Sequence, residues 1–119
     1  MPADAPDALT QFSDALAARA AALRPVVVAI RTGRSRRRSG TLWRADAVVA
    51  SEQVFPRTAE AEIVLADGST VKARVAGRDA GTNVVALRLE RPVEAAIPAA
   101  AEARLGALVL AGGAAPDGG

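Results

Sequence analysis

The polar residue best placed for chemistry is Gln53, which stands between two apolar runs in the stretch VVASEQVF (48–55). The run before it is expected to end a buried strand, and Val54 and Phe55 after it are expected to return to the interior. Polar residues at such strand ends are where a fold often presents chemistry. Glutamine neither gives nor takes a proton near neutral pH, so Gln53 cannot itself be a general acid or base.

The composition removes most other catalytic chemistry. The 119 residues include no histidine, cysteine or tyrosine, so the commonest general base, disulfides and thiolate metal sites are all absent. A hydrolase would have to use carboxylates, Lys72 or backbone groups. Glu60 and Glu62 share one strand face without partner acids, so we expect no metal site and no cofactor. No serine has a histidine to activate it: Ser13, Ser35, Ser39, Ser51 and Ser69.

Positive charge is concentrated in one segment, although the net charge is only +2. Six of the 15 basic residues lie between Arg31 and Arg44, where there is no acid. Guanidinium groups there could contact nucleic-acid phosphates or an acidic protein surface. A solvated hairpin loop is the simpler interpretation, because a short basic run is a weak motif and aromatic stacking partners are nearly absent. The candidate binding residues are Arg34, Arg36, Arg37 and Arg38.

The elements expected to position these residues are one helix and a series of short strands. Residues 7–24 predict an amphipathic helix that is capped by Asp4 and packs on the domain, and Pro25 ends it. After Pro25, apolar residues recur at the spacing of strands instead of that of a helix. Asp67-Gly68 predicts a two-residue hairpin turn. Strands are expected near 26–30, 41–43, 47–50, 61–65, 71–75, 83–90 and 105–113.

Six or seven short strands with regular turns and no crossover helix favour a small antiparallel β-barrel in a mostly β fold. The run 105–113 is expected to close the barrel, with an exposed docking strand as the alternative. Phe12, Trp43 and Phe55 are the few large side chains available to the core.

Targeting signals are absent from the chain as given. No stretch of about 18 apolar residues occurs, and the N-terminus lacks the apolar centre of a signal peptide. The chain as given is therefore expected in the cytoplasm. A chain from which a leader had been removed would look the same and would be periplasmic.

Four pieces of the sequence, in their order and spacing, resemble the first half of a trypsin-like serine protease of the HtrA (Deg) type. They span roughly residues 9–113, and their order rather than any single piece carries the resemblance. Those proteins open with a short helix and a strand, and a later strand ends in Thr-Asn-x-His-Val-Val. The pieces are RPVVVAIRTG, RSGTLWRADAVVASEQVF, AEIVLADGSTVKARVAGRDAGTNVVALRLE and ARLGALVLAGG.

The resemblance places the family's histidine position on Gln53 and its aspartate position on Asn83. In that family the histidine takes the proton of a nucleophilic serine, the aspartate orients the histidine, and the serine lies in a second barrel. Asn83 can accept a hydrogen bond but has no charge to stabilise an imidazolium, and no Gly-x-Ser-Gly stretch occurs. The resemblance therefore implies a degenerate, inactive homologue.

The expected organisation is a helix (1–24), a trypsin-like first barrel (25–113) and a disordered tail or truncated linker (114–119). We expect a non-catalytic serine protease homologue that binds or scaffolds protein, its partner being another protein, a second copy or a missing second barrel. Two alternatives stay open. The Arg-rich loop could bind nucleic acid or an acidic protein, or the chain could be the N-terminal fragment of a longer protease-like protein.

Overall fold

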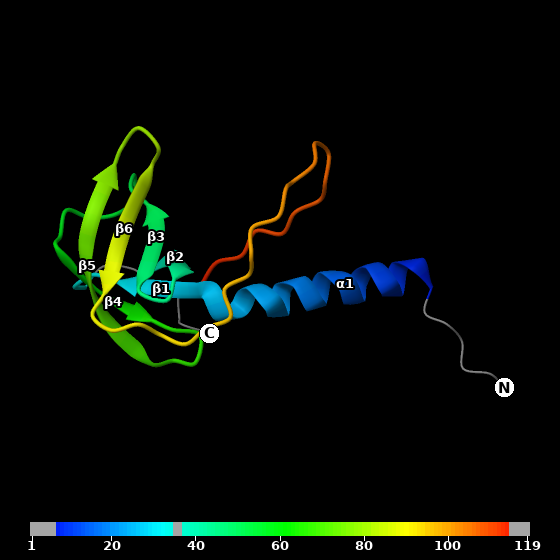
Figure 1. The fold of residues 1–119 in the computed structure, drawn as a ribbon, viewed down its shortest axis with the longest axis horizontal. Helices are drawn as coiled ribbons and strands as arrows, with labels where there is room; N and C mark the ends of the chain where they lie inside the picture. Colours follow the sequence, from blue (N-terminus) through cyan, green and yellow to red (C-terminus); the bar gives the residue numbers. More distant parts are fainter. Residues whose placement is uncertain (1–6, 35–36, 115–119) are drawn as a thin grey trace.

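The structure, a computed structural model, describes residues 7–34 and 37–114. One helix, α1, is followed by a short 3-10 turn, η1, and by six strands (Figure 1). Their bounds are α1 Ala8–Leu23, η1 Arg24–Val26, β1 Val27–Arg31, β2 Arg38–Arg44, β3 Ala47–Ser51, β4 Glu60–Val64, β5 Thr70–Asp79 and β6 Val84–Leu89.

The six strands form a closed antiparallel barrel in the order β1-β2-β3-β6-β5-β4. Closure comes from β1, which pairs with β2 on one side and with β4 on the other, so that Ile30 lies opposite both Arg38 and Ile63. A closed barrel leaves no strand with an unpaired edge. The predicted fold, a mostly β antiparallel barrel with one N-terminal helix, is confirmed.

The interior of the barrel is filled by β-branched side chains and leucines. Gly40 leaves room for them, because a Cβ atom at this position would lie 2.8 Å from Ile30 Cδ1 and 2.9 Å from Val48 Cγ1. Phe55 joins the core as expected and is only 4% exposed. The largest side chains that are less than 2% exposed are Ile30, Leu42, Ile63, Leu87, Val28, Val48 and Val85.

Three large apolar side chains that were expected inside are exposed. Trp43 is 63% exposed because side chains alternate along β2 and Leu42 next to it points inward. Val54 is 60% exposed because the turn after β3 points it away from the core. Phe12 is 48% exposed because it lies on α1, outside the barrel.

The expected closing strand at 105–113 is not formed, because pairing of β1 with β4 already closes the barrel. Residues 94–114 instead form an extended arm, drawn in orange to red in Figure 1, that leaves the barrel, turns at Leu105-Gly106 and returns. Its far end is fixed to β2, where the Ala114 N–H donates a hydrogen bond to Ser39 Oγ at 2.8 Å. The arm is exposed over most of its length but does not form the strand that the alternative interpretation expected.

The β4–β5 hairpin has the predicted alternation but a longer turn. Ala61 and Ile63 face the core and Glu62 lies on the outer face, where it pairs with Arg31. The predicted two-residue turn is wrong. The loop is Ala66–Gly68, closed by a hydrogen bond from Leu65 N–H to Ser69 O of 2.8 Å, and Gly68 adopts a φ of +87°. In three-residue hairpin loops, the third residue usually has a positive φ, and here that residue is Gly68.

Helix α1 projects away from the barrel instead of packing on it (Figure 1). Its N-cap is Asp7, which accepts a hydrogen bond from Thr10 N–H at 2.7 Å, whereas Asp4 lies outside the described residues. None of its residues is buried, and Leu23 alone is seen to pack against the core cluster. The radius of gyration is therefore 17.1 Å, against about 13.5 Å for a compact domain of this length. Among the described residues, no helix combines the length and hydropathy needed to cross a membrane.

Candidate functional site

Three loops meet at one end of the barrel, which we call the loop end. Because the strands are antiparallel, the ends of β1, β3 and β5 and the starts of β2, β4 and β6 lie there together. The loop end therefore carries the Arg-rich connection after β1, the β3–β4 loop (52–59) with Gln53, and the β5–β6 loop (80–83) with Asn83.

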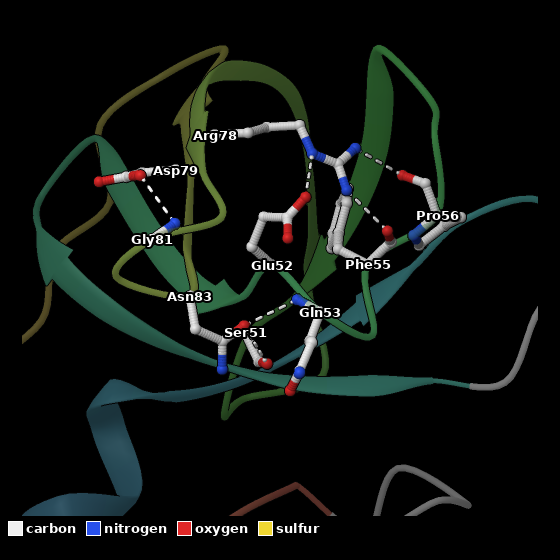
Figure 2. Close-up of polar contacts among 9 residues, drawn as sticks. All are labelled: Ser51, Glu52, Gln53, Phe55, Pro56, Arg78, Asp79, Gly81 and Asn83. Atoms are coloured by element: carbon white, nitrogen blue, oxygen red, sulfur yellow. Dashed lines mark hydrogen bonds and ion pairs between the residues drawn. The ribbon is translucent and has the colours of Figure 1, made fainter.

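Asn83 and Gln53 are in direct contact (Figure 2). The side-chain oxygen of Asn83, Oδ1, accepts a hydrogen bond from Gln53 N–H at 2.8 Å and another from Ser51 Oγ at 3.1 Å. Its backbone oxygen accepts a third from Glu52 N–H at 3.3 Å. Asn83 has a φ of +58°, a left-handed conformation that asparagine tolerates better than most residues. Asn83 thus holds three consecutive residues at the end of β3 and the start of the loop, Ser51, Glu52 and Gln53.

The β5–β6 loop is itself held in place by Asp79. Its carboxylate accepts hydrogen bonds from Gly81 N–H and Thr82 Oγ1, both at 3.0 Å. This fixes the loop just before Asn83 and so supports the left-handed turn there.

Neither Gln53 nor Asn83 can act as a general acid or base. Asn83 is neutral, and its Oδ1 is occupied by two donors. The Gln53 side chain is exposed and cannot ionise. Ser51 donates its hydroxyl hydrogen to an amide oxygen and not to a base, so its oxygen is not activated for attack.

Arg78 holds the other side of the β3–β4 loop and was missed by sequence reasoning. Its guanidinium donates to Phe55 O at 2.7 Å, to Pro56 O at 2.9 Å and to Glu52 Oε1 at 3.3 Å (Figure 2). It also lies 5.5 Å from the centre of the Phe55 ring. The register shift between Val75 and Gly77 turns Arg78 toward this loop. A glycine inside a strand is the one sequence signal that could have indicated such a bulge.

The Arg-rich loop adjoins the Gln53 turn. Arg38 Nε donates a hydrogen bond to the backbone oxygen of Val54, which ties the start of β2 to this turn. Arg34 is exposed and Arg37 is half-buried, while Arg36 lies outside the described residues. The structure thus places Arg38 against the turn that contains Gln53 and leaves Arg34 exposed to solvent.

No metal centre is formed by the part of the chain that the structure describes, where no group of three or more histidine, cysteine, aspartate or glutamate side chains could hold an ion.

Comparison with known proteins supports a trypsin-like barrel. Neither a protein-family model nor a curated protein sequence matches the chain. Among solved structures, the chain is similar to the crystal structure of the Rv3671c protease in its inactive form, with 22% sequence identity and a TM-score of 0.58. The match covers 86% of this chain and 49% of that one, so this chain spans about half the length of the solved protein. At this identity the likeness shows the fold alone.

Proposed function

We propose that the chain is a catalytically inactive homologue of trypsin-like, HtrA-type serine proteases that binds protein through its loop end. The observation that carries the proposal is the hydrogen bond between Gln53 N–H and Asn83 Oδ1. The resemblance assigns the general base and its supporting carboxylate to these two positions. They are adjacent, yet neither side chain can ionise near neutral pH.

The construction of the loop end supports a binding role. Asn83, Asp79 and Arg78 each make two or more hydrogen bonds that hold loop residues in place. The loop nevertheless exposes Gln53 and the apolar Val54. A preorganised surface loses little conformational entropy when a partner binds, which favours recognition.

Inactivity is tested with a fluorophosphonate probe, which labels activated serines. We expect no labelling of this chain and no hydrolysis of an unfolded protein substrate, because the sequence contains no histidine to activate a serine. Labelling of any of the five serines would overturn the proposed inactivity.

Binding through the loop end is tested by photo-crosslinking in the host cell, with benzoylphenylalanine in place of Gln53. The control carries the same group in place of Lys72, an exposed residue on the outer face of β5. We expect a discrete protein adduct at position 53 that is absent at position 72. Identical adducts at both positions, or none at position 53, would count against the proposal.

A second candidate, recognition of an acidic protein partner by the Arg-rich loop, is favoured by the bond between Arg38 and Val54, which makes this loop a neighbour of the Gln53 turn. A nucleic acid is less favoured, because Phe55 is the one aromatic residue among the described residues of the loop end and it is buried.

Binding of poly-glutamate and of a DNA oligonucleotide would be compared at two salt concentrations. We expect poly-glutamate binding to weaken in the double variant Arg34→Ala, Arg37→Ala, which spares Arg38. Equal binding by the variant would reject this candidate.

The third alternative is that the chain is the N-terminal part of a longer protease-like protein, which fits its span of about half the Rv3671c protease chain. An open reading frame that continues beyond codon 119 into a second barrel would support it, and a stop codon would reject it.

A further inference from the structure

An unburied apolar stripe runs along α1 and consists of Leu9, Phe12, Leu16, Ala20 and Leu23. Leu9 is 75% exposed and Phe12 48%, and no residue of this 16-residue helix is buried. In proteins, most of the stability of a helix comes from packing its amphipathic face and not from its intrinsic propensity. A helix of this kind therefore gains stability from a partner that covers the stripe.

The spacing of the stripe is symmetric about Leu16. Leu9 and Leu23 lie seven residues to either side of it, and Phe12 and Ala20 lie four residues to either side. If a second copy of α1 lies antiparallel with Leu16 against Leu16, Leu9 faces Leu23 and the large Phe12 faces the small Ala20. A surface that matches itself in this way is what a two-fold symmetric interface requires.

The charges of the helix favour the same orientation. The acids Asp7 and Asp14 lie in the N-terminal half, and the bases Arg19 and Arg24 lie in the C-terminal half and at the C-cap. An antiparallel pair places each acidic half beside a basic half and also opposes the two helix dipoles. A parallel pair would place like charges together.

A groove of about 650 Å³ lies at the C-terminal end of the stripe. It is lined by Ala20 and Leu23 of α1, by Leu110 of the arm, and by Val27 and Val64 on the outer face of the barrel. In the antiparallel arrangement, this groove lies opposite the exposed Leu9 of the second copy. An apolar recess and an exposed apolar side chain therefore meet at both ends of the pair.

We propose that this chain forms a two-fold dimer in which two α1 helices pack antiparallel and Leu9 of each copy enters the groove of the other. The proposal is independent of the loop end, because α1 joins the barrel at the opposite end. Two helices paired over about 24 Å make a small interface. We therefore expect reversible association with a Kd of about 10 µM.

Sedimentation velocity of the 119-residue chain over a concentration series tests the dimer. At about 100 µM, tenfold above the expected Kd, we expect a dimer that dissociates on dilution. Leu16→Asp is expected to be monomeric, whereas the matched control Ala18→Asp, on the opposite face of α1, is expected to stay dimeric. Neither position is buried, so far-ultraviolet circular dichroism should show an unchanged barrel in both. A monomeric wild type, or a Leu16→Asp variant that still dimerises, would overturn the proposal.

Cysteine crosslinking tests the orientation, since the chain contains no cysteine of its own. In the antiparallel pair, position 16 faces its own copy, whereas the two copies of position 9 lie about 21 Å apart along the axis. Under mild oxidation, Leu16→Cys is therefore expected to form a covalent dimer and Leu9→Cys is not. Efficient crosslinking of Leu9→Cys would show a parallel pair and contradict the proposal.

Discussion

At the scale of single residues, Asn83 determines the shape of the turn that presents Gln53. It adopts a left-handed φ of +58°, and its Oδ1 accepts from both Gln53 N–H and Ser51 Oγ. A side chain without an acceptor would lose both hydrogen bonds, and most residues are strained in this conformation. Substitution of Asn83 is therefore expected to lower the stability of the fold for structural reasons alone.

Asn83→Ala is predicted to lower the free energy of unfolding by about 1–3 kcal/mol, from two lost hydrogen bonds and backbone strain. Asn83→Asp keeps an oxygen that can accept both hydrogen bonds and keeps the tolerance for positive φ, so its loss should be smaller. Urea unfolding at pH 7 measures both variants. Equal stability of Asn83→Ala and the wild type would contradict the assigned role of Asn83.

Asp67 makes the stabilisation contributed by the β4–β5 turn depend on pH. Hydrogen bonds from the side chain and backbone of Ser69 to its carboxylate lower the pKa of Asp67 below the ordinary value of 3.8. Because the pKa is lowered in the folded state, the stabilisation is fully present above pH 3.8 and is lost as the pH falls through the folded-state value.

Asp67→Ala is therefore predicted to be less stable than the wild type at pH 7, and the difference should narrow as the pH falls below 3.8. Guanidinium unfolding at pH 7 and pH 2.5 checks this. Glu90→Ala is the control, since this exposed carboxylate makes no hydrogen bond or ion pair within the described part of the chain. A difference between Asp67→Ala and the wild type that is the same at both pH values would contradict the assignment.

At the scale of elements, β5 supports the β3–β4 loop through a single side chain. Arg78 lies just after the register shift of β5 and binds two backbone oxygens and one carboxylate of that loop. Its side chain is 21% exposed and that of Glu52 18%, so the pair is largely shielded from solvent. By contrast, the Arg88–Asp46 pair between β6 and the β2–β3 turn is 73% and 45% exposed.

Arg78→Ala is predicted to cost about 1.5–3 kcal/mol of stability, because it leaves carbonyl groups and Glu52 without a charged donor. Arg78→Lys should recover only part of this, since an ammonium cannot reproduce the planar fork. Arg88→Ala, the exposed control, should cost less than about 1 kcal/mol. Thermal unfolding ranks the three variants. Equal losses for Arg78→Ala and Arg88→Ala would show that Arg78 does not hold the loop.

The elements also show which features a sequence can predict. The alternation of Ala61, Ile63, Val71 and Ala73 was readable because period-two burial is a local pattern. The role of Arg78 was not, because the register shift in β5 reverses which side chains face inward.

At the scale of the whole molecule, the barrel contains the buried core, and α1 and the arm lie outside it. Six paired strands bury the core, whereas α1 and the arm contribute almost no buried residue. The amphipathic pattern of α1 was visible in the sequence, but such a pattern does not identify which surface covers it. Likewise, the apolar run 105–113 has the composition of a strand, but the barrel had no edge left to pair with it.

The adjacency of Gln53 and Asn83 was predictable only from the resemblance, because they lie on separate loops 30 residues apart in the chain. The structure brings them together by pairing β3 with β6, so that Ser51 lies opposite Val84. The central claim is that position 53 is the vacated site of a general base that residue 83 would support.

Nuclear magnetic resonance titration of the imidazole in Gln53→His, alone and combined with Asn83→Asp, tests this claim most directly. A carboxylate at position 83, held against the backbone of position 53, would favour the imidazolium. The imidazole pKa in the double variant should therefore exceed that of the single variant by about one unit. Equal pKa values in the two variants would show that residue 83 does not support a base at position 53 and would contradict the account.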